Sequence, residues 1–145
     1  MRRVLLAALT TLLIASCDSE EQTSGNATGA PEAAQPAMTT IGALAPDLPF
    51  PIPPEIPAPE DAQYIGESKT SPPYKAVQFS TAMNNELLKA ELKAFATDIG
   101  GRFDESLGQV TYMTEIEGTR HFVYAWVRTN EGNTRLEIGT AEITQ

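Results

Sequence analysis

The last third of the chain contains the sequence feature that most limits the possible folds, a pair of alternating segments around a glycine turn. Residues 109–117 and 120–128 each alternate between apolar and polar side chains, and Gly118-Thr119 lies between them. Alternation with a period of two is typical of a strand that buries one face, and a two-residue turn with glycine first joins neighbouring antiparallel strands. The sequence therefore predicts a β-hairpin that turns at Gly118-Thr119.

A helix is predicted upstream of this hairpin. Asn84 or Asn85 can cap its start, and Gly100-Gly101 can end it. Apolar residues recur at helical spacing between these ends, at Leu88, Leu92, Phe95 and Ile99. This spacing places the four apolar side chains on one face of the helix.

Three further segments predict strands. Residues 62–68 and 74–80 precede the helix, and residues 134–143 follow a polar loop at residues 129–133. The resulting order is β-β-α-β-β-β. We therefore expect a small α+β domain over residues 60–145, in which one helix packs on one face of an antiparallel sheet.

Two segments of unusual composition precede this domain. Residues 17–45 contain few bulky apolar side chains and no basic ones, which predicts a disordered acidic tether. Residues 46–59 hold most of the chain's 11 prolines, which favours extended backbone. This proline-rich segment is either a stiff spacer or a strap whose apolar side chains cover the domain. Those side chains are Leu48, Phe50, Ile52 and Ile56.

The beginning of the chain, residues 1–16, has the layout of a secretory signal peptide. Arg2 and Arg3 precede an uncharged, largely apolar run from Val4 to Ala15. The run is shorter than the roughly 18 apolar residues that a membrane-spanning helix needs. We therefore expect a cleaved signal and no transmembrane helix at this end.

The end of this signal resembles the lipobox of bacterial lipoproteins. Ile14-Ala15-Ser16-Cys17 supplies an aliphatic residue, two small residues and the required cysteine. The resemblance implies cleavage between Ser16 and Cys17 and attachment of acyl chains, palmitate among them, to Cys17. Two or more acyl chains hold a protein stably at a membrane. The resemblance thus implies a lipid-anchored protein on the periplasmic or extracytoplasmic side of a bacterial cell membrane, and Asp18 favours the inner membrane.

Cysteine usage and charge narrow the range of partners. Cys17 is the chain's one cysteine, so its lipidation leaves no thiol for disulfides, catalysis or metal binding. The chain has a formal net charge of −9, and loss of Arg2 and Arg3 with the signal makes the mature form more acidic. Such a charge argues against nucleic acid as a partner and leaves the acyl chains as the membrane contact. The oligomeric state stays open.

The predicted hairpin divides the apolar side chains of the sheet between two faces. One face carries Met113, Phe122, Tyr124 and Trp126, and a five-residue second loop adds Leu136 and Ile138. We expect this face to lie under the helix; the alternative is a ligand platform with Arg120 and Arg128 at its ends. The second face carries Val110, Tyr112, Ile116, Val123 and Val127. One helix covers one side of a sheet, so the second face is predicted to bind a partner protein, to lie under the proline-rich segment, or to be solvated.

Candidate catalytic and metal-binding residues are few. Glu115 and Glu117 share a predicted strand face with Arg120 opposite, but carboxylates beside a hairpin tip are usually solvated. His121 is the chain's one histidine and has no second His or Cys to complete a transition-metal site. The sequence therefore predicts no catalytic residue, no metal and no cofactor, and it argues against an enzyme.

The expected function is that of a protein-interaction module tethered in the cell envelope, with another envelope protein as its partner. Two alternatives stay open. One is a periplasmic enzyme inhibitor that acts through the hairpin loop at residues 115–121. The other is a small-ligand carrier that uses the aromatic residues of the sheet.

Overall fold

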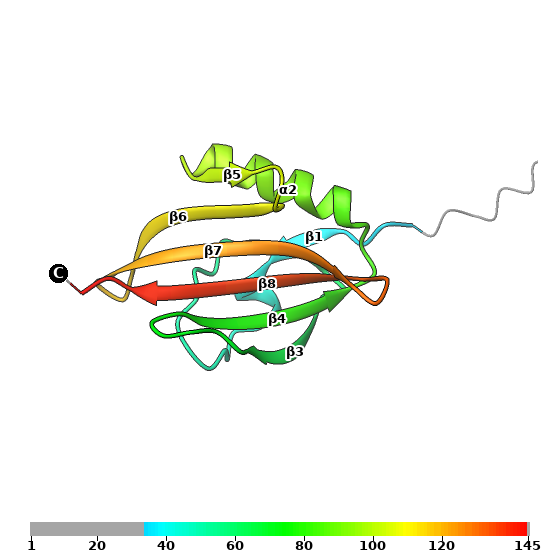
Figure 1. Cartoon of the computed structure of the whole chain (residues 1–145). Helices are drawn as coiled ribbons and strands as arrows, with labels where there is room; N and C mark the ends of the chain where they lie inside the picture. Colours follow the sequence, from blue (N-terminus) through cyan, green and yellow to red (C-terminus); the bar gives the residue numbers. More distant parts are fainter. Residues whose placement is uncertain (1–33, 145) are drawn as a thin grey trace, which may run out of the picture. The chain divides into compact units, whose positions relative to one another are not determined.

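A computed structural model describes residues 34–144, which form a six-stranded antiparallel sheet, a smaller two-stranded sheet and a 14-residue helix (Figure 1). These residues belong to one compact unit, Ala33–Gln145. The expected class, a small α+β fold, is confirmed. The predicted signal peptide, the lipobox and the tether up to residue 33 lie outside the described residues.

The main sheet has the strand order β3-β4-β8-β7-β6-β5, and every neighbouring pair is antiparallel. Its strands are β3 (Gln63–Ser68), β4 (Lys75–Thr81), β5 (Arg102–Asp104), β6 (Gln109–Ile116), β7 (Thr119–Asn130) and β8 (Asn133–Glu142). All of them except β5 match predicted segments. β5 is a strand that the β-β-α-β-β-β order lacks, because three residues are too few to show a period.

The predicted helix is confirmed as α2, which spans Asn85–Asp98. The Asn84 side chain caps its start by accepting a hydrogen bond from the Glu86 backbone N–H at 2.8 Å. Gly100 follows the helix with a φ of 68°, the left-handed conformation in which glycine commonly ends helices. The local signals in the sequence thus place both ends of α2 correctly.

The chain before β3 also belongs to the folded unit. β1 (Met38–Thr40) pairs with β2 (Pro57–Pro59), and α1 (Ile41–Leu44) follows β1 directly. The Ile41 N–H donates to the Ile56 carbonyl at 2.9 Å, and these two side chains are 1% and 0% exposed. The expected disordered tether over residues 17–45 is therefore wrong for residues 38–44. Ile41 buries its side chain although most of its neighbours in sequence are small or polar.

The proline-rich segment, residues 46–59, covers part of the core. Phe50, Ile56 and Ala58 belong to the buried cluster, and Leu48 and Ile52 pack against it. Of the two roles that the sequence leaves open, the structure fits the strap and not the free spacer. The folded domain therefore begins well before residue 60, the boundary expected from the sequence.

The first hairpin turns at Glu117-Gly118, one residue earlier than predicted. These residues have φ values of 52° and 80°, as a two-residue type I′ turn requires. Met113 consequently lies opposite Phe122 and not opposite Tyr124. The strands are displaced by two residues relative to the prediction, so each side chain stays on its predicted face.

The second hairpin differs more from the prediction. It turns at Glu131-Gly132, with φ values of 51° and 80°, in place of the expected five-residue loop. Leu136 consequently lies opposite Val127. A change of one residue in register transfers every side chain of a strand to the other face of the sheet. Leu136 and Ile138 therefore share the face of Val127 and Ala125, and the aromatic residues lie on the other face.

This register determines which face of the main sheet is covered. The covered face carries buried side chains from four strands, namely Val77, Phe79, Val110, Val123, Ala125, Val127, Leu136 and Ile138. Leu88, Leu92 and Ala96 of α2 belong to the same cluster. The expectation that the aromatic residues lie under the helix is therefore wrong, because α2 packs on the face opposite to them. In Figure 1 the uncovered face is turned toward the reader.

Candidate functional site

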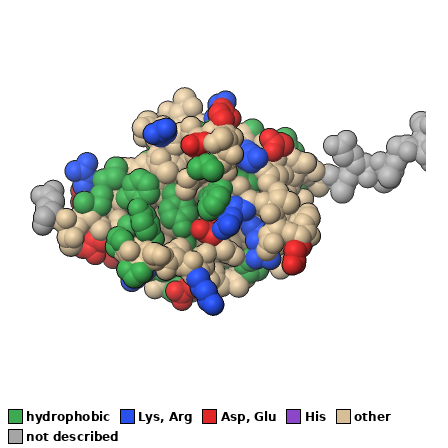
Figure 2. Space-filling view, in the orientation of Figure 1, with side chains coloured by type: hydrophobic (Ala, Val, Ile, Leu, Met, Phe, Trp, Pro, Cys, Tyr) green, Lys and Arg blue, Asp and Glu red, His purple; other side chains and the backbone are tan. Residues whose placement is uncertain are grey.

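Aromatic and apolar side chains gather on the uncovered face of the main sheet (Figure 2). Alternation along β7 places Phe122, Tyr124 and Trp126 there, with Met113 of β6 opposite Phe122. Tyr74, which precedes β4, packs its ring 6.1 Å from the ring of Phe122 and 6.3 Å from that of Tyr124, between centroids. Tyr74 and Met113 are 41% and 43% exposed. These five side chains form what we call the aromatic face.

The Tyr124 ring packs against β8 because residue 139 is a glycine. A Cβ atom at Gly139 would overlap the ring and stand 2.6 Å from Tyr124 Oη. The hydroxyl donates a hydrogen bond to Glu137 Oε1 at 3.0 Å. Burial, followed by the neighbouring Glu137 carboxylate, raises the pKa of the Tyr124 hydroxyl well above its ordinary value. The hydroxyl therefore keeps its proton, and can donate it to Glu137, to a higher pH than an exposed tyrosine would.

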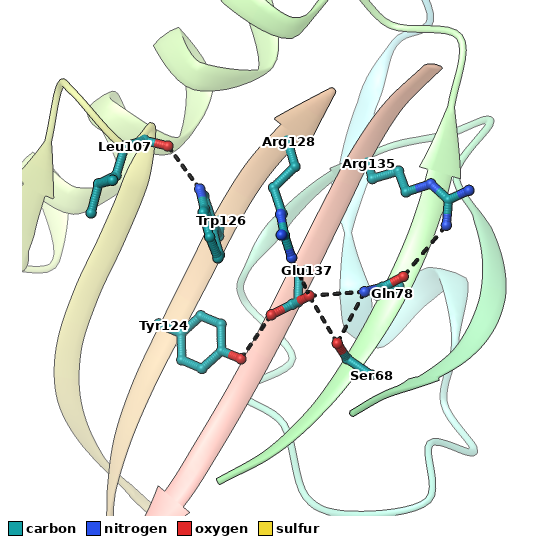
Figure 3. Close-up of polar contacts among 8 residues, drawn as sticks. All are labelled: Ser68, Gln78, Leu107, Tyr124, Trp126, Arg128, Arg135 and Glu137. Atoms are coloured by element: carbon teal, nitrogen blue, oxygen red, sulfur yellow. Dashed lines mark hydrogen bonds and ion pairs between the residues drawn. The ribbon is translucent and has the colours of Figure 1, made fainter. Parts of the chain in front are cut away.

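Glu137 is a buried carboxylate beside the aromatic face, and it gathers donors from β3, β4 and β7 (Figure 3). Its Oε2 accepts hydrogen bonds from Ser68 Oγ and Gln78 Nε2, both at 2.9 Å. Arg128 Nη1 pairs with the same oxygen at 3.2 Å, while Tyr124 satisfies Oε1. A buried charge is tolerated when it is paired and hydrogen-bonded in this way. Glu137 thus links four side chains of the uncovered face.

Trp126 joins this polar cluster to the aromatic face. Its Nε1 donates to the Leu107 carbonyl at 2.8 Å, which fixes the ring against the loop before β6. The guanidinium carbon of Arg128 lies 4.1 Å from the centroid of the Trp126 ring, a cation–π contact. Arg128 therefore contacts both Trp126 and Glu137.

A hollow of about 210 Å³ lies next to Glu137, and we call it the arginine hollow. Its lining consists of Gln78, Arg128, Thr129, Asn130, Arg135 and Glu137. Arg135 Nη1 lies 3.5 Å from Gln78 Oε1, a long hydrogen bond. Arg135 Nε is buried and has no hydrogen-bond partner among the described residues. The hollow thus contains guanidinium donors that the protein satisfies only in part.

The residues predicted to form a partner-binding face lie in or against the core instead. Val110 and Val123 are 0% exposed, and Val127 is 2% exposed. Tyr112 and Ile116 are half-buried and pack against the same cluster. The physical reason is the register of the second hairpin, which brings the apolar side chains of β8 to this face. It is the more apolar of the two, so the helix and the strap cover it.

The charged residues near the hairpin tip form no compact arrangement. Glu115 lies opposite Arg120, while Glu117 lies in the turn, and all three are exposed. His121 is half-buried opposite Glu142 and lines a hollow of about 450 Å³ together with Lys75. Within residues 34–144, no group of three or more His, Cys, Asp or Glu side chains could hold a metal ion.

The cluster around Glu137 is not predicted from the sequence, although a signal for it exists. Gln78 and Glu137 each lie between two apolar residues on a strand. The observed register places them directly opposite each other on adjacent strands. Polar residues at alternate positions mark the second face of a sheet, but they can be grouped only when the register is known.

A scan against protein-family models and searches of the curated proteins and of the solved structures found no match to this chain. Among residues 34–144, the structure contains no helix long and apolar enough to cross a membrane. Cys17 and the cleavage site after Ser16 lie outside the described residues, so lipidation stays a prediction.

Proposed function

We propose that this chain is a lipid-anchored lipoprotein of the bacterial cell envelope whose α+β domain binds another envelope protein through the aromatic face. The main support is the unequal cover of the sheet. The helix and the proline-rich strap bury one face, whereas the other leaves Tyr74 and Met113 exposed beside two further aromatic rings, Phe122 and Trp126. A contiguous exposed apolar surface that contains aromatic side chains is typical of protein-binding sites.

The anchor is proposed from the lipobox alone. In this proposal the Cys17 sulfur takes a diacylglyceryl group, and a signal peptidase cleaves between Ser16 and Cys17. The domain would lie on the extracytoplasmic side, and Asp18 would favour retention at the inner membrane. The residues between Cys17 and β1 would separate the anchor from the domain.

The partner-binding proposal is preferred to the two alternatives for a geometric reason. A small-ligand carrier encloses its ligand, whereas the depression next to Tyr74 and Phe122, of about 300 Å³, is open to solvent. A hairpin inhibitor would contact its enzyme through residues 115–121 and not through Met113 or Trp126. The proposed function involves no catalysis.

Site-specific photo-cross-linking in the native envelope tests the binding surface. A photoreactive amino acid replaces Met113 on the aromatic face, Glu117 at the hairpin tip or, as a control, Leu87, which is 47% exposed on α2. We expect a protein to be captured from position 113 but not from position 87, and the substitution Phe122→Glu to abolish that capture. Capture from position 117 alone would favour the inhibitor. Equal capture from all three positions would contradict the aromatic face as the binding surface.

Metabolic labelling with a palmitate analogue tests the anchor. The unmodified chain should incorporate the label and sediment with membranes, because acyl chains supply the proposed membrane contact. Cys17→Ser removes the thiol that would carry the acyl group, so it should abolish the labelling. Undiminished labelling of this variant would show that the lipid is attached at another residue.

A further inference from the structure

Two arginines occupy opposed positions on β7 and β8 at the edge of the aromatic face. Arg128 lies directly opposite Arg135 in the strand register. Like charges in directly opposed positions of a sheet destabilise it. Among the described residues, Glu137 is the one carboxylate that lines the arginine hollow, and it pairs with Arg128. The arginine hollow therefore keeps one positive charge in excess, on a chain whose formal net charge is −9.

The protein itself uses few of the guanidinium donors that line this hollow. The hydrogen bond that Arg135 Nη1 donates to Gln78 Oε1 is long, at 3.5 Å, and the buried Nε of Arg135 makes none among the described residues. Arg128 uses Nη1 for Glu137, while its side chain stays 46% exposed. A guanidinium group carries five N–H donors, so both arginines have donors left for a ligand. Thr129 and Asn130 add neutral polar groups to the lining.

We propose that the arginine hollow binds a carboxylate, specifically an aspartate or glutamate side chain of the protein that docks on the aromatic face. This inference rests on the proposed function. A single carboxylate matches the single excess positive charge, whereas a phosphate dianion would leave the hollow negative. Arginine also binds planar carboxylates in a fork geometry. The partner is thus a protein that presents an acidic residue next to apolar side chains, the latter packing on Trp126 and its neighbours.

The fluorescence of Trp126 provides a direct test, because it is the chain's one tryptophan and Arg128 stacks on it. The probe is an end-blocked pentapeptide, Gly-Phe-Asp-Phe-Gly, added to the full chain in detergent. The matched control peptides carry asparagine or phosphoserine in place of aspartate. We expect a saturable fluorescence change with the aspartate peptide and at least tenfold weaker binding of the asparagine peptide, the loss typical of a hydrogen bond to a charged group. Equal affinity for these two peptides, or tighter binding of the phosphoserine peptide, would overturn the carboxylate assignment.

Amino-acid substitutions and a salt titration then test whether the difference in affinity between the two peptides arises at the arginine hollow. Arg135→Gln should lower the affinity for the aspartate peptide about tenfold and leave the affinity for the asparagine peptide unchanged. Arg102→Gln on the outer strand β5 removes the same charge at an exposed position, and it should change neither of the two affinities. If the Arg135→Gln variant does not fold, a higher NaCl concentration should still lower the affinity of the unmodified chain for the aspartate peptide and not for the asparagine peptide. An aspartate peptide that is insensitive to both salt and Arg135 would refute the site. Continued cross-linking from position 113 in that case would leave the proposed docking function intact.

Discussion

The ring of Tyr124 occupies the space in which residue 139 would carry a side chain. A Cβ atom at Gly139 would overlap that ring, and this same position brings the Tyr124 hydroxyl to Glu137 at 3.0 Å. The ring also contacts Tyr74 edge-on. A glycine on β8 thereby helps to determine both the packing of the aromatic face and the hydrogen bonding of the carboxylate beside it.

Gly139→Ala should destabilise the fold by about 1–3 kcal/mol, the usual cost of inserting a methyl group into a packed site. The free energy of unfolding in urea, followed by Trp126 fluorescence, measures this effect. In a Tyr124→Ala background the methyl group has room, so the same substitution should cost much less. An equal loss of stability in both backgrounds would show that the alanine methyl group at position 139 does not clash with the Tyr124 ring.

Glu137→Gln should also lower stability, by about 1–3 kcal/mol, because Arg128 loses its buried counter-ion and the amide cannot accept all the hydrogen bonds that the carboxylate accepts. The matched control is Glu142→Gln at the exposed end of the same strand, which should stay within about 0.5 kcal/mol. Both are measured by urea unfolding. Equal free energies of unfolding for the two variants would mean that the Glu137 contacts make no net contribution to stability.

Two tyrosines predict how stability changes at alkaline pH. Burial raises the pKa of Tyr124, with Glu137 adding to it, and burial also raises the pKa of Tyr112, with Glu55 adding to it. The unfolded chain loses these protons near pH 10, whereas the folded chain keeps them. The tyrosine contribution to stability is therefore complete below about pH 10 and is lost as the pH rises further. Urea unfolding between pH 8 and 11 should show a shallower alkaline decline in the double variant Tyr112→Phe/Tyr124→Phe, and an identical decline would contradict the shifts.

Local signals in the sequence are sufficient to predict most helices and strands of the domain. Asn84 marks the start of α2 through a cap within three residues, and α2 could be predicted because such a signal needs no distant partner. The strands of the two hairpins show their alternation in the sequence in the same way. β1 and α1 could not be predicted, since Ile41 is buried through its pairing with the distant Ile56 and not through any local period.

The site was harder to predict, because it depends on register. Glu131 has a φ of 51°, which is unfavourable for glutamate, so the sequence predicts a five-residue loop there and not a tight turn. That single difference places Leu136 on the covered face and Glu137 on the open one. A prediction that found five of the six strands of the main sheet was therefore compatible with an inverted assignment of core and surface. The predicted partner face became the core, and the predicted floor of the core became the candidate binding surface.

Both hairpin turns place a glutamate in the left-handed region, at Glu117 with a φ of 52° and at Glu131 with a φ of 51°. Asparagine followed by glycine is preferred in such type I′ turns, so Glu117→Asn and Glu131→Asn should each stabilise the domain by up to about 1 kcal/mol. Thermal or urea unfolding measures the gain. Glu117→Gln removes the same charge without relieving the backbone, and it should not reproduce the gain. An equal gain from asparagine and glutamine would assign the effect to charge.

The strap makes the most direct prediction about where the domain begins. Ile56 of the proline-rich segment is 0% exposed and belongs to the core cluster that contains Val110 and Val123. Ile56→Ala should therefore cost about 2–5 kcal/mol, as for other fully buried aliphatic side chains. Ile65→Ala is the matched control, because Ile65 is 45% exposed on the edge strand β3 and its truncation should cost far less. Urea unfolding of the two variants distinguishes a strap from a spacer: a spacer residue would be as tolerant of truncation as Ile65, whereas a residue of the folded core would lower both the midpoint and the free energy of unfolding.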